Sequence, residues 1–192
     1  GPVYAESMTS SPILLGHLEL DLGENLDSLE NWNREGGLLA VQALSPLAAL
    51  SPEKRERLSL VAAGPGSALA VLTAVALGFG RVDAALHPDD QEACRDPLET
   101  RGKSNLVGRV EDLPRDARHH RALLGMDGEI PSRADWDPLV SVLRHEGQLV
   151  VFGFPRSSQE QVFEDLASSG MSLRASGRAG DLVFLSGSLE GA

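Results

Sequence analysis

Apolar residues along this chain follow two different periods after Leu38. Short apolar runs predict buried strands, and the segments between them have helical spacing. The predicted strands are LSLVAA, RVDAAL, LVGRV, RALLGM and QLVVFGF, at residues 58–63, 81–86, 106–110, 121–126 and 148–154. The predicted helices are 38–44, 67–77, 89–99 and 136–143. Strands that alternate with helices indicate a mostly parallel sheet covered on both faces.

The chain ends with a different pattern, which begins with one more helix. Ser157 and Glu160 have the spacing of a capping box, and Gly170 is placed to end the helix. The predicted buried stripe of this helix is Val162, Phe163 and Leu166.

Two short apolar segments, MSLRAS and DLVFLSG, follow that helix and are separated by a tight turn at 177–180. They predict a hairpin, so the last strand must run antiparallel to its neighbour. We therefore expect an α/β fold: a Rossmann-like three-layer sandwich around a mixed seven-stranded sheet with a C-terminal antiparallel hairpin.

The first part of the chain is set apart by its acidity. Residues 12–36 contain six acids against Arg34 alone, and Leu18, Leu20 and Leu22 alternate with polar residues as in a short half-exposed strand. We expect an acidic arm at 1–36 and a folded domain at 37–192. The acids suit either a solvated arm or a surface that faces a partner.

Composition limits the classes of function. The 192 residues suit one folded domain, and 28 acids against 17 bases give a net charge of −11. Such a balance disfavours nucleic acid and anionic membranes as partners, so another protein is the expected partner. Cys94 is the single cysteine, the start of the chain has no signal-peptide pattern, and no apolar run reaches 18 residues. We expect a cytoplasmic protein.

A small-residue turn is the first candidate site. Gly64, Pro65, Gly66 and Ser67 lie between a predicted buried strand and a helix, where a ligand can approach the backbone. Glycine in this position also serves strand–helix packing alone. The turn lacks the Gly-Lys-Ser/Thr ending of a phosphate loop and the third glycine of the dinucleotide fingerprint.

Residues 38–188 resemble a class I S-adenosylmethionine-dependent methyltransferase domain, most of all the group that methylates a ribosomal protein of the large subunit. The segments that carry the likeness are LSLVAAGPGSALAV, GFGRVDAALHPDD, VEDLP, ADWDPLVSVLRHEGQLVVFGF and SSQEQVFEDLASSGMSLRASGRAGDLVFLSG. The resemblance implies a cofactor site at the glycine turn, at His87 after the second strand, and at Asp112 and Leu113 in VEDLP.

The departures from this family concern the cofactor. The resemblance implies an acid near the end of the first strand and another at the end of the second, where it would accept the ribose hydroxyls. Ala62 stands at the first position, and the second strand ends in Ala84-Ala85-Leu86. Because a methyl group cannot replace a charge-assisted contact to two hydroxyls, cofactor binding is expected to be weak or lost. Asp83 and Asp89 are the nearest acids that could substitute.

No catalytic motif is recognisable after the fourth strand, which continues as GMDGEIPSR. Asp127 and Glu129 are candidate general bases or exposed loop acids. His119 and His120 are adjacent, so their side chains diverge and predict no metal site, and no Ser–His–Asp set follows from the spacing. The basic stretch Arg115–Arg121 is expected to be a solvated helix face rather than a docking site.

Three functions are compatible with these patterns. The first is a methyltransferase-fold domain that has lost catalysis and binds or scaffolds another protein. The second is an active, divergent methyltransferase in which His87 and backbone groups replace the carboxylates. The third is a nucleotide-dependent reductase, which predicts a further strand–helix unit after Phe154 instead of a hairpin.

Overall fold

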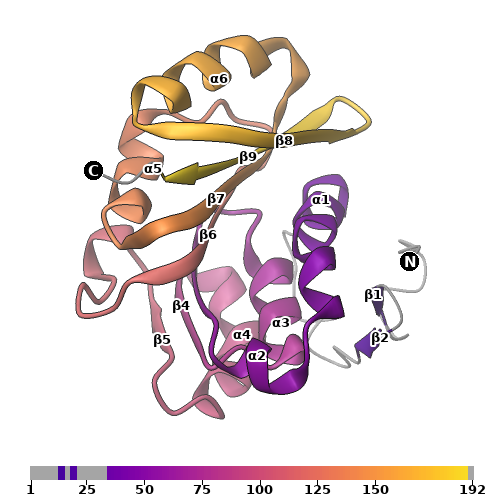
Figure 1. Cartoon of the computed structure of the whole chain (residues 1–192), viewed down its shortest axis with the longest axis vertical. Helices are drawn as coiled ribbons and strands as arrows, with labels where there is room; N and C mark the ends of the chain where they lie inside the picture. The colour runs from indigo at the N-terminus through magenta and orange to yellow at the C-terminus, as the bar shows by residue number, and fades with distance from the viewer. Residues whose placement is uncertain (1–12, 16–17, 21–33, 190–192) are drawn as a thin grey trace.

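Seven strands form one mixed sheet in the order β5-β4-β3-β6-β7-β9-β8 (Figure 1). The protein is represented by a computed structural model that describes residues 13–15, 18–20 and 34–189. The strands are β3 (Ser59–Ala63), β4 (Arg81–Ala85), β5 (Asn105–Val107), β6 (His119–Gly125), β7 (Leu143–Pro155), β8 (Met171–Ala179) and β9 (Leu182–Leu189). Strands β3 to β7 pair in parallel, whereas β9 is antiparallel to both β7 and β8. The predicted sheet and C-terminal hairpin are confirmed, and the extra unit of a reductase is not found after Phe154.

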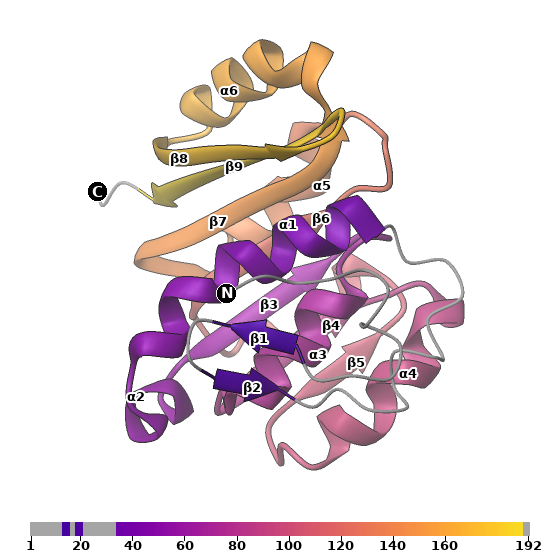
Figure 2. The same cartoon turned by 90° about the vertical axis from the view of Figure 1, so that its right-hand side faces the viewer.

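Helices cover both faces of this sheet and complete the three layers (Figures 1 and 2). The helices are α1 (Arg34–Leu44), α2 (Pro52–Glu56), α3 (Ala68–Leu77), α4 (Pro88–Glu99), α5 (Arg133–Val140) and α6 (Gln159–Ser168). Short 3-10 turns are η3 (Ser45–Ala49), η4 (Val110–Asp112) and η5 (Arg156–Ser158). The core is split by the sheet into two clusters, one under α1, α3 and α4 and the other under α5 and α6.

Successive residues of a central strand belong alternately to the two core clusters, one on each face of the sheet. In β3, Leu60 and Ala62 belong to the first cluster, whereas Val61 and Ala63 belong to the second. Because both faces are buried, the strand is a continuous apolar run instead of an alternation. This is why the sequence pattern predicted the central strands correctly.

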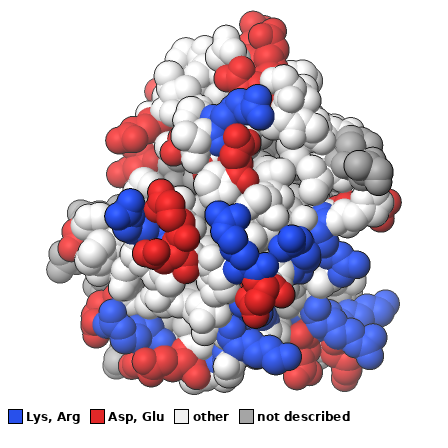
Figure 3. All heavy atoms as spheres, turned by 90° about the vertical axis from the view of Figure 1, so that its left-hand side faces the viewer, with Lys and Arg blue, Asp and Glu red and all other residues white. Residues whose placement is uncertain are grey.

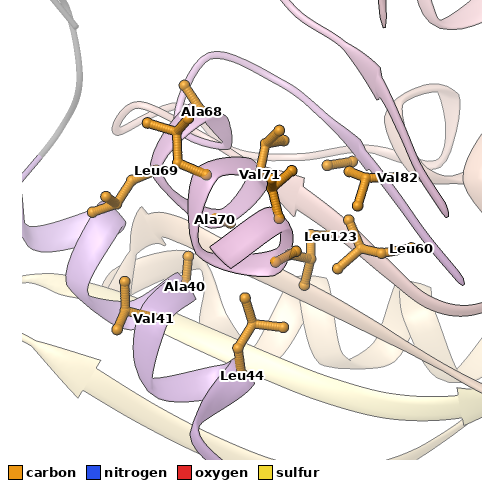
Figure 4. Close-up of a cluster of buried hydrophobic side chains, with 14 of the residues drawn as sticks. Ala40, Val41, Leu44, Leu60, Ala68, Leu69, Ala70, Val71, Val82 and Leu123 are labelled. Atoms are coloured by element: carbon orange, nitrogen blue, oxygen red, sulfur yellow. The ribbon is translucent and has the colours of Figure 1, made fainter. Parts of the chain in front are cut away.

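Helix α3 is the most deeply buried helix, since α1, α4 and the sheet surround it (Figure 4). Small residues such as Ala40 of α1 and Ala70 of α3 lie in the contact between these helices. The one polar side chain of α3, Thr73, donates a hydrogen bond to the carbonyl oxygen of Leu69, 2.8 Å away. Burial on all sides explains why this helix is uniformly hydrophobic. Among the described residues, no helix is long and apolar enough to cross a membrane.

The start of α6 differs from the prediction. Residues Arg156–Ser158 form a 3-10 turn, and Ser158 donates its hydroxyl to the carbonyl of Pro155 instead of capping α6. The predicted capping box at Ser157 is therefore wrong, because the chain tightens into η5 before the helix starts. A capping box does occur at the start of α5, between Ser132 and Asp135.

The predicted buried stripe of α6 also needs a correction. Val162 and Leu166 are buried, but Phe163 is 48% exposed, because it follows Val162 by one position and so points away from the sheet.

Helix α5 covers 133–140 rather than 136–143, since the capping box starts it three residues earlier.

Two short strands precede the domain, β1 (Ile13–Leu15) and β2 (Leu18–Leu20), and pair with each other in antiparallel fashion. Leu20 is buried in the cluster that holds α3, which agrees with the predicted short strand at Leu18 and Leu20. Leu22 and most acids of the arm lie outside the described residues. The division of the chain at residue 36 stays a prediction.

Candidate functional site

The predicted site residues all follow the carboxyl ends of parallel strands. Residues 64–67 follow β3, His87 follows β4, 108–113 follow β5 and 126–129 follow β6. Parallel strands end at the same edge of a sheet, which is called the carboxyl edge below, and ligands of open α/β sheets bind at such edges. The fold therefore brings these predicted residues to one side of the molecule.

The glycine turn at this edge is packed against β6. Gly64 has a φ of +96°, and a Cβ there would lie 2.0 Å from the carbonyl oxygen of Gly125. A Cβ on Gly66 would lie 2.9 Å from the carbonyl oxygen of Met126. The Gly66 amide donates to the carbonyl of Gly125 at 3.4 Å. The close backbone approach that requires these glycines is therefore made by the chain itself.

The other residues of the turn support its shape. Ser67 is fully buried, and its hydroxyl donates to the carbonyl of Gly64 at 2.7 Å. Pro65 is exposed at the tip. The Ser67 hydroxyl is thus engaged within the turn.

The ends of the two central strands are apolar. Ala62, Ala85 and Leu86 are all buried, and none offers a polar group beyond its backbone. Asp83, one of the two expected substitutes, lies in the middle of β4 and is bonded to Arg81 and Asn105. Its carboxylate is therefore engaged by Arg81 and Asn105 and does not lie at the carboxyl edge, where a ligand would bind.

His87 begins helix α4. Its Nδ1 accepts a hydrogen bond from the Asp89 amide at 3.2 Å and lies 3.4 Å from the Asp89 carboxylate. The imidazole is well exposed, so His87 and Asp89 act together as a helix cap at the surface.

The VEDLP segment separates its two predicted residues. Asp112 is exposed at the end of η4, whereas Leu113 is buried in the cluster under α5. Asp127 and Glu129 are exposed in the loop after β6. All three acids are therefore exposed at the carboxyl edge.

Three solved structures share this architecture at low sequence identity. The ribosomal protein L11 methylase of Lactobacillus delbrueckii subsp. bulgaricus is 21% identical, with a TM-score of 0.55 over 78% of this chain and 80% of that one. The fibrillarin pre-rRNA processing protein of Methanococcus jannaschii is 13% identical, with a TM-score of 0.56 over 74% and 70%. The precorrin-6y C5,15-methyltransferase of Geobacter metallireducens is 18% identical, with a TM-score of 0.51 over 77% and 89%. No family model and no curated protein matches the sequence.

The chain has the fold of class I S-adenosylmethionine-dependent methyltransferases. The fold resemblance drawn from the sequence is thereby confirmed. The residues at the carboxyl edge of this methyltransferase fold do not fit the carboxylate contacts that the resemblance implies for the cofactor. Both strand ends are apolar, and the glycine turn is filled by the backbone of β6.

One acid near the carboxyl edge was not among the residues predicted from the sequence. Asp90, in the first turn of α4, is 3% exposed, and its Oδ1 has no hydrogen-bond partner. Burial is the main cause that raises the pKa of this carboxyl; His87 opposes it in part, and the nearby Asp89 and Asp127 add smaller increases. The signal was available, because Asp90 precedes the buried Cys94 by one helical turn and therefore lies on the same inner face of α4.

The opposite edge of the sheet, called the amino edge below, holds a polar network. The Ser59 hydroxyl lies 2.6 Å from Nδ1 of His119, whose Nε2 lies 3.5 Å from Oδ2 of Asp83. The side chains of His119 and Asp83 are fully buried. The register of β3 with β4 and β6 brings these residues together, although no such set was found from spacing.

Asp83 is the centre of this network. Burial would raise its pKa, but the nearby His119, whose Nε2 lies 3.5 Å away, and the hydrogen bonds from Arg81 and Asn105 outweigh burial and hold the pKa below the ordinary value for a carboxyl.

His120 is only half-buried: its Nδ1 accepts a hydrogen bond from the Ser59 amide at 3.2 Å, and its Nε2 lies 2.7 Å from a nitrogen of Arg144. The two adjacent histidines, whose side chains were expected to diverge, thus both contact Ser59.

The predicted helix at 115–121 is wrong. The segment is a loop that enters β6 at His119, because the buried pairing of His119 with β7 requires extended backbone. Its exposed members include Arg115 and Arg118. Within the described part of the chain, no group of three or more His, Cys, Asp and Glu residues could hold a metal ion.

Proposed function

We propose that this methyltransferase-fold domain has lost methyl transfer and acts by binding another protein. The observation that carries the proposal is the apolar character of both strand ends, Ala62 and Ala85, in a fold that is otherwise kept. A carboxylate that accepts two hydroxyls contributes about 1.5–3 kcal/mol, so its loss weakens cofactor binding by about tenfold to a hundredfold.

An exposed apolar surface supports the protein-binding part of the proposal. Phe163, 48% exposed on α6, borders a hollow of about 330 Å³ that Leu173 and Leu185 of the terminal hairpin also line. Strand β8 is the outer strand of the sheet and lies beside this hollow. An outer strand can pair with a strand of another protein, and Phe163 adds an exposed aromatic side chain beside it.

Calorimetric titration with S-adenosylmethionine tests the loss of the cofactor. We expect no saturable heat at micromolar concentrations, and micromolar binding at 1:1 stoichiometry would refute the proposal. For the partner surface, affinity capture from extract of the native cells should lose its specific protein on Phe163→Glu. The matched control is Ile130→Glu, at an exposed position of the loop before α5, which should leave capture unchanged.

A divergent methyltransferase is the second candidate, and Asp90 is the observation that favours it. A buried carboxyl with an unpartnered oxygen at this edge would gain a hydrogen bond from a bound hydroxyl or amine. This candidate predicts transfer of a labelled methyl group to a component of native extract, and loss of that transfer in Asp90→Asn. Absence of labelling in the wild-type protein would exclude it.

A further inference from the structure

A cavity of about 440 Å³ opens at the amino edge, away from the predicted cofactor residues. Four segments line it, and each lies at or just before the start of a strand. They are residues 56–59 at β3, 80–81 at β4, 102–103 before β5 and 117–118 before β6. These segments are far apart in sequence but adjacent in space, because the parallel strands β3, β4, β5 and β6 all start at this edge. The volume is in the range of small-molecule sites.

Cations from four separate segments line the cavity, in a chain whose net charge is −11. They are Arg57, Arg81, Lys103 and Arg118. On one face of the molecule, Figure 3 shows Lys and Arg side chains gathered over its lower half with acids between them. The local excess of cations at the cavity therefore runs against the overall charge of the protein.

The charges at the cavity are only partly balanced. Arg81 forms ion pairs with Asp83 and Asp116, each at 3.0 Å, so its single charge is more than balanced by the two carboxylates. The side chains of Arg57, Lys103 and Arg118 have no ion pair with any residue in the described ranges, and Glu56 is the one acid that lines the cavity with them. With Asp83 and Asp116 counted, four cations face three acids, which leaves one net positive charge at the cavity.

The floor and one wall of the cavity are held in place. Ser59 is half-buried at the cavity, and its hydroxyl contacts the buried His119. The Arg118 guanidinium is oriented by two hydrogen bonds of 3.3 Å to the carbonyls of Arg115 and Ala117. Orientation by the main chain leaves other guanidinium N–H groups of Arg118 available, and it lowers the entropy lost on binding an anion.

We propose that this cavity binds a small phosphorylated metabolite through Lys103, Arg118 and Arg57. A phosphate group offers several anionic oxygens, which suit cations that converge from separate segments, and guanidinium groups bind such oxygens in pairs. The described residues that line the cavity include no aromatic side chain, so the ligand is recognised by its phosphates and not by a stacked base. Inorganic pyrophosphate is the simplest probe with this chemistry.

Calorimetry at low ionic strength with inorganic pyrophosphate tests the proposal. Saturable binding to the wild-type protein should weaken by about tenfold or more in the Lys103→Ala, Arg118→Ala double variant. The control is Arg95→Ala, Arg133→Ala, which removes the same charge from two exposed helix positions and should bind like wild type. Thermal unfolding of both variants should match the wild type, because all four side chains are exposed.

Three outcomes would overturn the site. They are absence of pyrophosphate binding to the wild type, equal binding by the double variant and the wild type, and equal weakening by the control variant. Citrate provides a comparison without phosphate, and binding as tight as that of pyrophosphate would overturn the assignment to phosphate. The test is independent of the titration with S-adenosylmethionine, so either proposal can fail alone.

Discussion

The two edges of the sheet differ in the kind of residue that they bury. At the carboxyl edge, β3 and β4 end in buried alanines, and Gly64 is packed against the backbone of β6. At the amino edge, Ser59 and His119 begin β3 and β6 and contact each other, and His119 also lies near Asp83 in the middle of β4, beside a cavity lined by cations. The two edges therefore differ in their polar groups although both belong to one methyltransferase fold, which agrees with the rule that a fold by itself does not assign a functional site.

The largest effect is expected from Gly64→Ala at the carboxyl edge. The new Cβ would meet the Gly125 carbonyl at 2.0 Å in a left-handed backbone conformation, so we expect a loss of about 3 kcal/mol or more in the free energy of unfolding. The control is Gly78→Ala, where φ is +89° but nothing lies within 4 Å, and about 1 kcal/mol is expected. Equal losses in urea denaturation would show that β6 does not fill the turn.

Asp83→Asn tests whether the amino edge depends on its buried acid. Removing the charge leaves the paired Arg81 guanidinium with its exposed partner Asp116 only, and we expect a loss of about 2–4 kcal/mol in the free energy of unfolding. Asp116→Asn removes the exposed partner of the same arginine and should change stability little. A similar effect of both variants in urea denaturation would contradict a buried centre at Asp83.

The pH dependence of the Asp83 contribution follows from the direction of its shift. Because the folded pKa lies below the ordinary value, the contribution is complete above the unfolded pKa of about 4 and is lost as pH falls through the folded pKa. The stability difference between wild type and Asp83→Asn should therefore shrink on acidification below pH of about 4. A constant difference across that range would argue against the hydrogen bonds assigned to the carboxylate.

Asp90→Asn should have the opposite sign. The buried carboxyl has a raised pKa, so holding it ionised at neutral pH costs stability, and the neutral amide should raise the free energy of unfolding by about 1 kcal/mol. The gain should fade as pH drops through the raised pKa, where the wild-type acid becomes neutral. Destabilisation by this variant at neutral pH would show that the Asp90 carboxylate has a stabilising partner.

The smallest effect concerns Cys94, whose pKa is raised to about 12 by burial and by the neighbouring Asp90. Since the thiolate is the reactive form, a thiol reagent at neutral pH should label Cys94 only as fast as the protein unfolds. Labelling in the folded protein at the rate of a free thiol would contradict the packing of α4 against α3.

The sheet and its hairpin could be predicted because burial on both faces leaves continuous apolar runs, as at 58–63, and because a hairpin joins strands that are adjacent in sequence. The predicted position of its turn, 177–180, is wrong: residues 177–179 still belong to β8 and pair with β9, so the turn lies at Gly180 and Asp181. The start of α6 could not be predicted, because Ser157 has the spacing of a capping box but the chain forms a 3-10 turn there. The amino-edge network depends on strand register that joins Ser59 to His119, 60 residues away. One signal was present, an acid inside the apolar run RVDAAL, but its partners are set by long-range pairing.

The central claim is that ligand-binding chemistry lies at the amino edge and not at the carboxyl edge. Amide chemical shifts of one labelled sample, titrated separately with inorganic pyrophosphate and with S-adenosylmethionine, test it most directly. We predict that pyrophosphate shifts the amides around Lys103 and Arg118, whereas S-adenosylmethionine leaves those at 64–67 and at His87 unchanged. Saturable shifts at 64–67 with S-adenosylmethionine, and none at residues 102–103 and 117–118 with pyrophosphate, would contradict the account.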